Sequence, residues 1–239
     1  MDAALPLPVK ITTPPTWLRQ TLLILQKDLA IELATKEIVT TSGFFAVLVA
    51  TIASLAFLGG ADVRQRVAPG VIWVAVAFAA VLALSRAWQR ERDDGALNGL
   101  LVSPVARSAI FAGKALGLSV FLLTIEAIVI PVTAVFFGID LVQVGPGLAL
   151  FCLMVTPGLA ASGTLFGAMT VRTRARDLVL AAVMFPLLTP TLLAGVAGTR
   201  ELFYGATVAE VFDYYALIGV FDALFVMGGL GMFGLLIEG

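Results

Sequence analysis

The sequence predicts an all-α polytopic membrane protein with six transmembrane helices, preceded by an amphipathic helix at the membrane interface. Apolar residues fill 60% of the 239 positions and only 13% are charged, whereas soluble domains carry about 25% charged residues. The apolar residues gather in six long runs, and the loops between the runs alternate between many and few basic residues. We therefore divide the chain into an N-terminal cytoplasmic segment, 1–42, and a membrane domain, 43–239.

Six apolar runs are the candidate membrane spans. A helix needs about 20 mostly apolar residues to cross the hydrocarbon core, and the first two runs are slightly short. Backbone polar groups in lipid must be satisfied within the segment, which predicts helices, and no alternating pattern suggests a barrel. The predicted spans are 43–58, 68–84, 115–137, 147–171, 178–198 and 215–237.

The distribution of Lys and Arg predicts the orientation. Twelve basic residues lie before the first span, between the second and third spans, or between the fourth and fifth, and three lie in the other connections. Because basic residues mark the cytoplasmic side, we expect both termini and the loops 85–114 and 172–177 to be cytoplasmic.

The segment before the first span predicts an amphipathic helix lying along the cytoplasmic surface. Leucines recur on one helical face, while Arg19 and Lys27 point elsewhere. Ile24 and Ile31 lie on the far side, so burial of that side against the bundle is an equal alternative. The leucines of the predicted apolar face are Leu18, Leu22, Leu25, Leu29 and Leu33.

Composition also excludes several kinds of chemistry. The chain has no histidine, which removes the usual general base and the commonest ligand for metals and haem iron. The single cysteine, Cys152, forms neither an internal disulfide nor a cysteine cluster. With a net charge of −1 and no long basic block, nucleic acid is not an expected partner. Gly113-Lys114 lacks the flanking residues of a Walker motif, so ATP hydrolysis requires another chain.

The loop 85–114 is the most charged part of the chain. Leu97, Leu100 and Leu101 have the spacing of one helical face, and a charged run, 90–94, precedes them. A short helix here could dock into a groove of a cytosolic partner; the alternative is a solvated loop whose arginines only set the topology. The candidate coupling residues are Glu91, Arg92, Asp93, Asp94, Gly95, Leu97, Leu100, Leu101 and Pro104.

Two resemblances rest on particular motifs. The run Glu-Arg-Asp-Asp-Gly-Ala-Leu at 91–97, continued by 100–104 and by Gly-Lys at 113–114, resembles the loop of ABC-2-type permeases. The run Ala-Pro-Gly-Val-Ile-Trp-Val-Ala at 68–75, with Thr-Arg-Ala-Arg-Asp at 173–177 and Phe-Pro-Leu-Leu-Thr-Pro at 185–190, is similar to the CcmB family of haem exporter proteins.

The resemblance implies a non-catalytic permease subunit in the bacterial inner membrane, acting in haem delivery or haem-chaperone release for cytochrome c maturation. It implies a cytosolic ABC ATPase that holds the ATP, a haem-handling membrane subunit, a haem chaperone, and two copies of this chain per complex. Haem would be handled by the complex, and we expect this chain to bind no cofactor and to supply none of the iron ligands, since it has no histidine.

Two acidic residues fall inside predicted spans. A charged carboxylate at the bilayer centre costs about 2.5 to 3.5 kcal/mol on insertion scales, so Glu126 and Asp222 should face the bundle interior or a cavity. Each has a functional interpretation, such as gating, and a structural one, a hydrogen bond to a neighbouring helix. Gly163 and Gly167 have the spacing that permits close helix contact.

The basic loop at the end of the fourth span has two interpretations. Arg172, Arg174 and Arg176 could anchor the topology against anionic lipid or form a second contact with the ATPase.

Three other functions remain alternatives: an ABC-2-type exporter of a lipid, polysaccharide or drug, a membrane scaffold that does not transduce ATP energy, and an intramembrane enzyme that uses Glu126 and Asp222.

Overall fold

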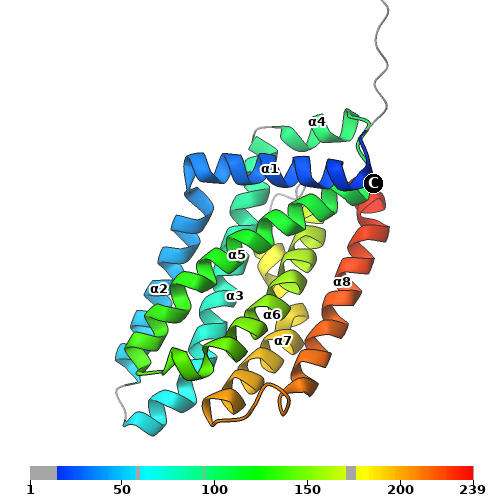
Figure 1. Ribbon diagram of the computed structural model, residues 1–239. Helices are drawn as coiled ribbons and strands as arrows, with labels where there is room; N and C mark the ends of the chain where they lie inside the picture. The colour runs from blue at the N-terminus through cyan, green and yellow to red at the C-terminus, as the bar shows by residue number, and fades with distance from the viewer. Residues whose placement is uncertain (1–14, 58–59, 94, 171–175, 239) are drawn as a thin grey trace, which may run out of the picture.

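The computed structural model describes residues 15–57, 60–93, 95–170 and 176–238, and these form eight helices (Figure 1). The two that do not span the bundle are α1, Trp17–Thr35, and the short α4, Ala96–Val102. Six others are long and apolar enough to cross a membrane. These are α2 (Glu37–Ala56), α3 (Ala61–Asp93), α5 (Arg107–Phe137), α6 (Leu141–Thr170), α7 (Arg176–Phe203) and α8 (Phe212–Glu238).

The six predicted spans are confirmed as helices, and every one is longer than predicted or begins earlier in the sequence. The largest difference falls on 85–114, which the sequence predicted to be a loop. Its first part continues α3 to Asp93, its middle is α4, and its last part is the first two turns of α5. Charged residues ended the predicted spans too early, because these charges find partners on other helices and the helices therefore continue past them.

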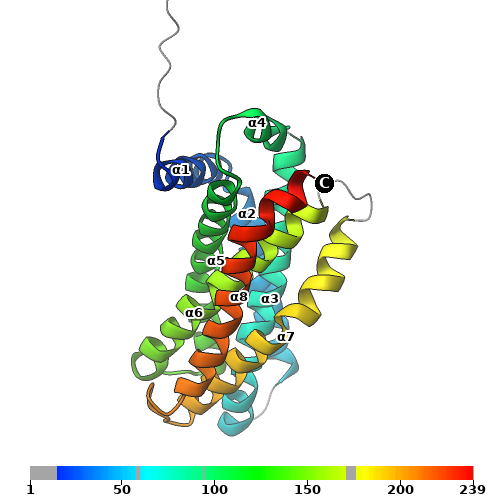
Figure 2. The ribbon, with the colours of Figure 1, turned by 90° about the vertical axis from the view of Figure 1, so that its right-hand side faces the viewer.

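The helix α1 lies across one end of the bundle (Figures 1 and 2). Its last residue is followed by Lys36, whose positive φ of 55° ends α1 and turns the chain into α2. The buried carboxylate of Glu32 supports this corner, because its Oε1 accepts the N–H of Val39 at 2.9 Å in the first turn of α2. A side chain of α1 thus caps the next helix.

The face of α1 that packs on the bundle is the isoleucine side. Ile24 is buried and lies so close to Gly113 of α5 that a Cβ at Gly113 would be 2.7 Å from the Ile24 Cβ. By contrast, three leucines of the predicted apolar face, Leu18, Leu22 and Leu33, form an exposed leucine row, whereas Leu25 and Leu29 are half-buried. The exposed leucines are therefore available to lipid along the interface, while the neighbouring face of the same helix is packed against protein.

Small residues let α3 pack closely against α6 and α7. On α6, Gly163 and Gly167 receive the side chains of Leu84 and Trp88 from α3, which bears out the close contact predicted from their spacing. On α7, a Cβ at Gly195 would lie 2.9 Å from the ring of Trp73. The indole N–H of Trp73 donates to Thr199 at 2.9 Å, so this buried ring has its polar group satisfied.

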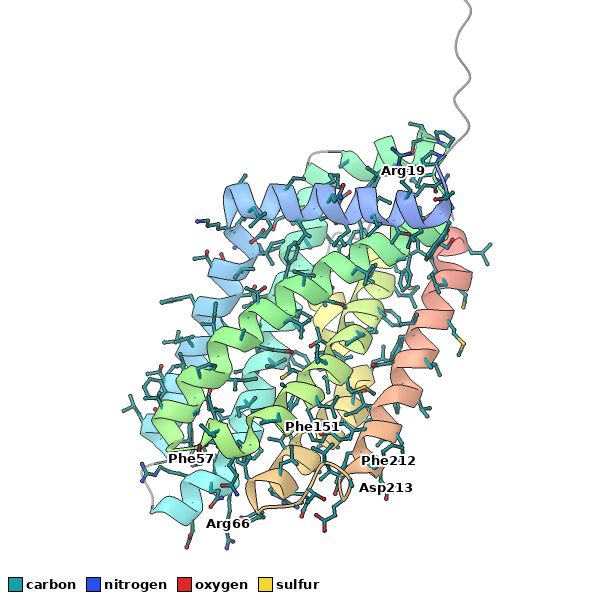
Figure 3. The ribbon with its side chains drawn as sticks, in the orientation of Figure 1. Arg19, Phe57, Arg66, Phe151, Phe212 and Asp213 are labelled. Carbon is teal, nitrogen blue, oxygen red and sulfur yellow. The ribbon has the colours of Figure 1, made fainter. Side chains whose placement is uncertain are left out.

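The two ends of the bundle differ in construction. The α1 end also holds α4 and the last turn of α8, whereas the opposite end holds the connections α2–α3, α5–α6 and α7–α8 (Figure 1). Figure 3 marks the two ends with Arg19 at one and Arg66 and Asp213 at the other, and Phe151 lies inside the bundle between them. The described part of the chain therefore begins and ends at the α1 end of the bundle.

Candidate functional site

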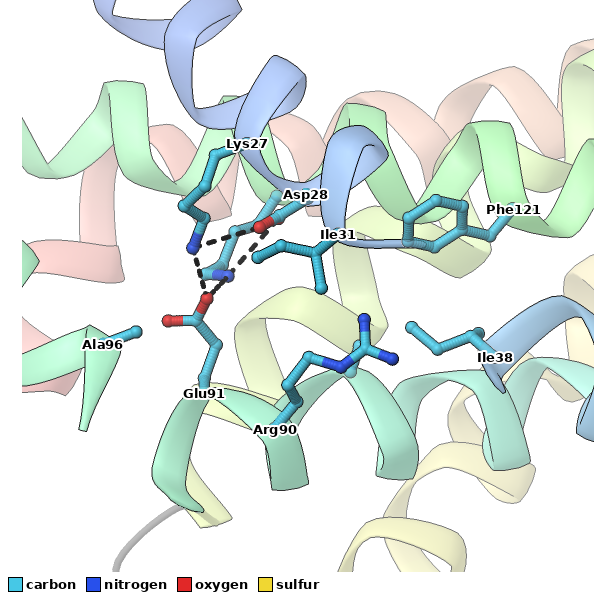
Figure 4. A pocket seen from close by; sticks show the side chains of 10 residues that line it. Lys27, Asp28, Ile31, Ile38, Arg90, Glu91, Ala96 and Phe121 are labelled. Atoms are coloured by element: carbon cyan, nitrogen blue, oxygen red, sulfur yellow. Dashed lines mark hydrogen bonds and ion pairs between the residues drawn. The ribbon is translucent and has the colours of Figure 1, made fainter. Parts of the chain in front are cut away.

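Four charged side chains meet where α1, α3 and α5 converge, and we call them the ionic cluster: Lys27 and Asp28 of α1, Glu91 of α3 and Lys114 of α5 (Figure 4). The Oε1 of Glu91 is 2.6 Å from the Nζ of Lys27 and 2.7 Å from the Nζ of Lys114. Each lysine also contacts Asp28, at 3.1 Å and 3.4 Å. Two cations and two anions thus connect three helices that are distant in the sequence.

The ionic cluster is largely withdrawn from solvent. The side chains of Glu91 and Lys114 are only 7% and 9% exposed, and the Lys114 ammonium lies 5.5 Å from the centre of the Trp88 ring. Burial by itself lowers the pKa of Lys27, but the charge of Asp28 and the bond to Glu91 outweigh it, so this pKa lies above its usual value. Lys27 therefore keeps its positive charge at physiological pH.

A second group of charges extends the ionic cluster toward α2. The guanidinium of Arg90 contacts the Oε2 of Glu32 at 3.4 Å and of Glu37 at 3.3 Å, and it donates to Thr35 at 3.1 Å. Arg86, one turn earlier on α3, lies 3.5 Å from Glu37. The end of α3 is thereby tied to both sides of the α1–α2 corner, which fixes α1 against the bundle.

The short helix α4 follows directly on this anchored end. Gly95 begins it with a φ of 62°, a conformation that glycine adopts without strain. At its other end the guanidinium of Arg107 donates to the carbonyls of Leu100 and Leu101, at 3.4 Å and 2.9 Å. Because these carbonyls have no partner within the helix, Arg107 acts as its C-terminal cap.

Two of the three leucines of the predicted docking face lie against the bundle. Leu100 and Leu101 are half-buried and pack against the core, so they face the protein's own bundle. Val102 is 88% exposed and Pro104 is also exposed. Glu91, expected to contact a partner, is turned inward. Among these residues, Val102 and Pro104 are therefore open to solvent, whereas Glu91 and the two leucines are largely covered.

The remaining residues predicted for this site are only partly described. Arg92 and Asp93 form the last turn of α3, Leu97 lies in α4 and Arg176 begins α7, but their side chains are outside the described part. Asp94, Arg172 and Arg174 lie outside the described residues altogether.

Glu126, in the middle of α5, has a polar partner on α6. The hydroxyl of Thr156 lies 2.9 Å and 3.0 Å from its two carboxylate oxygens, and Cys152 lies nearby. Cys152 and Thr156 are one turn apart and so share a face of α6. Glu126 is 2% exposed, and this arrangement fits the structural interpretation, a hydrogen bond that links two helices.

Asp222 of α8 lies on a different side of α6. It approaches Gly158 so closely that a Cβ there would overlap its Oδ1, and this oxygen has no hydrogen-bond partner of good geometry among the described residues. Thr156 and Gly158 are separated by about 200° around the helix. Glu126 and Asp222 therefore do not form a carboxylate pair, and the intramembrane enzyme that would use them together has no support in this geometry.

Sequence reasoning missed three members of the ionic cluster: Lys27, Asp28 and Lys114. The available signal was indirect. Lys114 directly precedes a predicted span, and Lys27-Asp28 interrupts a helix assigned to the surface. The structure explains the Gly113-Lys114 pair: Gly113 lets α1 approach α5, and Lys114 pairs with Asp28 of α1.

Comparisons with known proteins agree with one another. The profile of a family described as CcmB protein matches residues 19–228. The chain is 31% identical to heme exporter protein B of Paracoccus denitrificans over 157 residues, which cover 64% of this chain and 70% of that protein. It is 29% identical to that of Bradyrhizobium diazoefficiens, over 59% of this chain and 63% of the relative. The same protein of Pseudomonas aeruginosa is 28% identical, over 68% and 72%.

Proposed function

The chain belongs to the CcmB family, and we propose that it is the permease subunit of an ATP-driven complex that serves haem delivery or haem-chaperone release in cytochrome c maturation. The six-helix bundle supplies the membrane part. The chain itself is the non-catalytic subunit, and ATP is hydrolysed on a separate cytosolic ATPase.

The observation that carries the ATPase contact is the position of α4. This helix is held at one end of the bundle by Arg107 and by the packing of Leu100 and Leu101, and it presents Val102 and Pro104 outward. An exposed apolar side chain flanked by fixed structure is a suitable anchor for a groove in a partner. The ATPase would therefore dock at the α4 end.

The ionic cluster gives a route by which a push on α4 reaches the membrane. Two residues separate α4 from α3, and the cluster joins α3 to α1 and α5. The 33 residues of α3 extend about 50 Å, so a displacement at its α4 end moves the opposite end of the bundle as well. ATP binding and hydrolysis would then alternate the position of α3 between two states.

The proposed orientation is supported by the charge distribution considered together with the fold. All basic-rich connections would lie at the α1 and α4 end, which is therefore the cytoplasmic end of a bacterial inner-membrane protein, with both termini inside. We further propose two copies of the chain per complex, with a haem-handling membrane subunit and a haem chaperone as partners. Because the chain has no histidine, the iron ligands would come from another subunit.

A pair of matched substitutions tests the ATPase contact. Val102 and Val142 are 88% and 89% exposed and lie at opposite ends of the bundle. We expect Val102→Asp to abolish co-purification of an ATPase with the affinity-tagged chain and to abolish cytochrome c maturation in cells, because a charge replaces the apolar anchor. Val142→Asp should leave ATPase recruitment unchanged.

Each outcome separates the proposal from its alternatives. An ATPase recovered with haem or a haem chaperone supports the permease of cytochrome c maturation, whereas an ATPase without them favours an exporter of another substrate. If Val102→Asp loses the ATPase yet maturation continues, the chain is a scaffold. Equal recruitment by both variants would contradict docking at α4.

A further inference from the structure

A pocket opens at the end of the bundle opposite the ionic cluster. It lies between the first turn of α3, the α5–α6 turn and the end of α7, so three connections that are remote in sequence enclose it. Arg64 and Gln65 of α3 line one side. The amide of Gln65 donates to the carbonyl of Phe203 at 2.6 Å, which fixes α3 against α7 beside the pocket.

Arg64 is the cation of this pocket, and its guanidinium is incompletely satisfied. Its Nε is buried and has no hydrogen-bond partner among the residues that the structure describes. A buried donor of a charged group left without a partner costs free energy. A guanidinium forms its strongest pairs with carboxylate and phosphate groups, so an acid group that entered the pocket would supply the ion pair that Arg64 lacks in the described structure.

One acid lines the same pocket without neutralising Arg64. Asp140 accepts the N–H of Val142 at 2.9 Å and thereby caps the start of α6. No ion pair joins it to Arg64 in the described structure. The other walls come from apolar side chains, among them Phe137, Val144 and Phe203, all three of them buried.

We propose that this pocket binds the acid group of an amphipathic anion, with Arg64 as its pairing cation and the apolar side chains beside it as the contact for the ligand's apolar part. Haem has this chemistry, because a pair of carboxylates projects from one edge of an apolar ring. An anionic phospholipid headgroup has it too. The site takes the acid group and supplies no ligand to iron.

The choice of haem as the ligand rests on the proposed function and adds a binding site to it. Arg64 and Glu91 are carried by the same helix, about 40 Å apart along its axis. A movement of α3 at the ionic cluster would therefore displace Arg64 relative to the α5–α6 turn and change how well the pocket holds its ligand. The pocket would bind in one state of the cycle and release in the other.

The test is a titration of the purified full chain in neutral detergent micelles. Ferric haem and its dimethyl ester, which has no free acid group, are followed by visible absorbance, for the unchanged chain and for Arg64→Gln. The matched control is Arg66→Gln, which removes an exposed cation two residues away. A second arm counts phosphatidylglycerol molecules retained from phosphatidylglycerol and phosphatidylcholine vesicles, by native mass spectrometry.

We expect Arg64→Gln to weaken haem binding about tenfold or more while Arg66→Gln has little effect. The unchanged chain should discriminate haem from its ester, and Arg64→Gln should not. Loss of retained phosphatidylglycerol in Arg64→Gln, without discrimination between haem and ester, identifies the lipid as the source. If Arg64→Gln matches Arg66→Gln in both arms, the proposal is overturned.

A variant that binds the ligand more tightly distinguishes a loss of the site from misfolding. Asp140→Asn keeps a side chain that caps a helix and removes the one acid described in the pocket, so the identified ligand should bind about two- to threefold more tightly. Unfolding cannot produce this result, and a loss of binding in Asp140→Asn would contradict the pocket. Recruitment of the ATPase by Arg64→Gln is measured in parallel; an unchanged chain that recruits no ATPase refutes the proposed function while leaving the titration valid.

Discussion

Single charges decide how the surface helix is held. Lys114 and Glu91 are almost fully buried and contact one another at 2.7 Å, whereas Arg86 and Glu37 are 42% and 50% exposed at 3.5 Å. Exposed pairs contribute about 0 to 1 kcal/mol, and breaking a buried pair by removing one partner costs about 3 to 5 kcal/mol. Both contacts are ion pairs, but only the buried one should contribute measurably to the free energy of unfolding.

We predict that Lys114→Met lowers the free energy of unfolding by about 3 kcal/mol, because Glu91 then keeps a buried charge with a single lysine partner. Glu37→Gln should change it by less than about 1 kcal/mol. Denaturation in mixed detergent micelles measures both.

The double variant Glu91→Met with Lys114→Met completes the cycle. It removes one charge of each sign and leaves Lys27 paired with Asp28 at 3.1 Å, so it should be more stable than Lys114→Met alone. Additive losses in the double variant would show that the two residues do not act together.

At the scale of the helices, packing decides where each element ends. The apolar runs were sufficient to predict all six spans, because a helix satisfies its backbone within the segment and the runs lack the alternating pattern of a barrel. They were not sufficient for the end of α3, since Arg90 and Glu91 find their partners 58 and 64 residues away in the chain. For the same reason the sequence left two alternatives open for the face of α1 that packs on the bundle: the contact between Ile24 and Gly113, which decides for the isoleucine side, is not visible in any local pattern.

The same limit applies to the candidate site. Burial of Glu126 and its need for a polar neighbour could be predicted from the cost of a carboxylate in lipid, but its partner Thr156 could not. The candidate coupling segment was predicted from its charges and its resemblance, but the bond from Arg107 that holds the end of α4 could not be predicted.

The close contact between α3 and α6 predicts how one added methyl group, in Gly167→Ala, changes stability. Gly167→Ala would overlap the Trp88 ring, whose centre lies 5.5 Å from the ammonium of Lys114 in the ionic cluster. We expect a loss of about 1 to 3 kcal/mol in the free energy of unfolding. Gly228→Ala on α8 has open space around the new methyl group and should be neutral or slightly stabilising. The thermal unfolding midpoint of Gly167→Ala should therefore lie below that of Gly228→Ala.

For the molecule as a whole, the fold has two distinct ends and a single cysteine. Cys152 is buried between α5 and α6, so the unchanged chain should react little with an impermeant thiol reagent. Both described termini lie at the α4 end (Figure 2). Exposed cysteines placed at the two ends can therefore report the orientation without other changes.

We predict that Val142→Cys is labelled by an impermeant maleimide in intact spheroplasts, whereas Val102→Cys is labelled only in inverted vesicles. The reason is the proposed orientation, in which basic residues retain the α4 end in the cytoplasm. Labelling of Val102→Cys from outside would reverse the proposed orientation and exclude α4 from an ATPase contact.

The placement of α1 also has a consequence for how the chain is made. The indole of Trp17 donates to Ser108, 91 residues further on, and Gln20 accepts the N–H of Ala106, 86 residues further on. At a synthesis rate of about 5 to 20 residues per second, α1 waits roughly 5 to 18 s for these partners to leave the ribosome. During that interval its exposed leucines can bind the membrane surface. Lipid therefore holds α1 first, and the contacts with Ser108 and Ala106 form later.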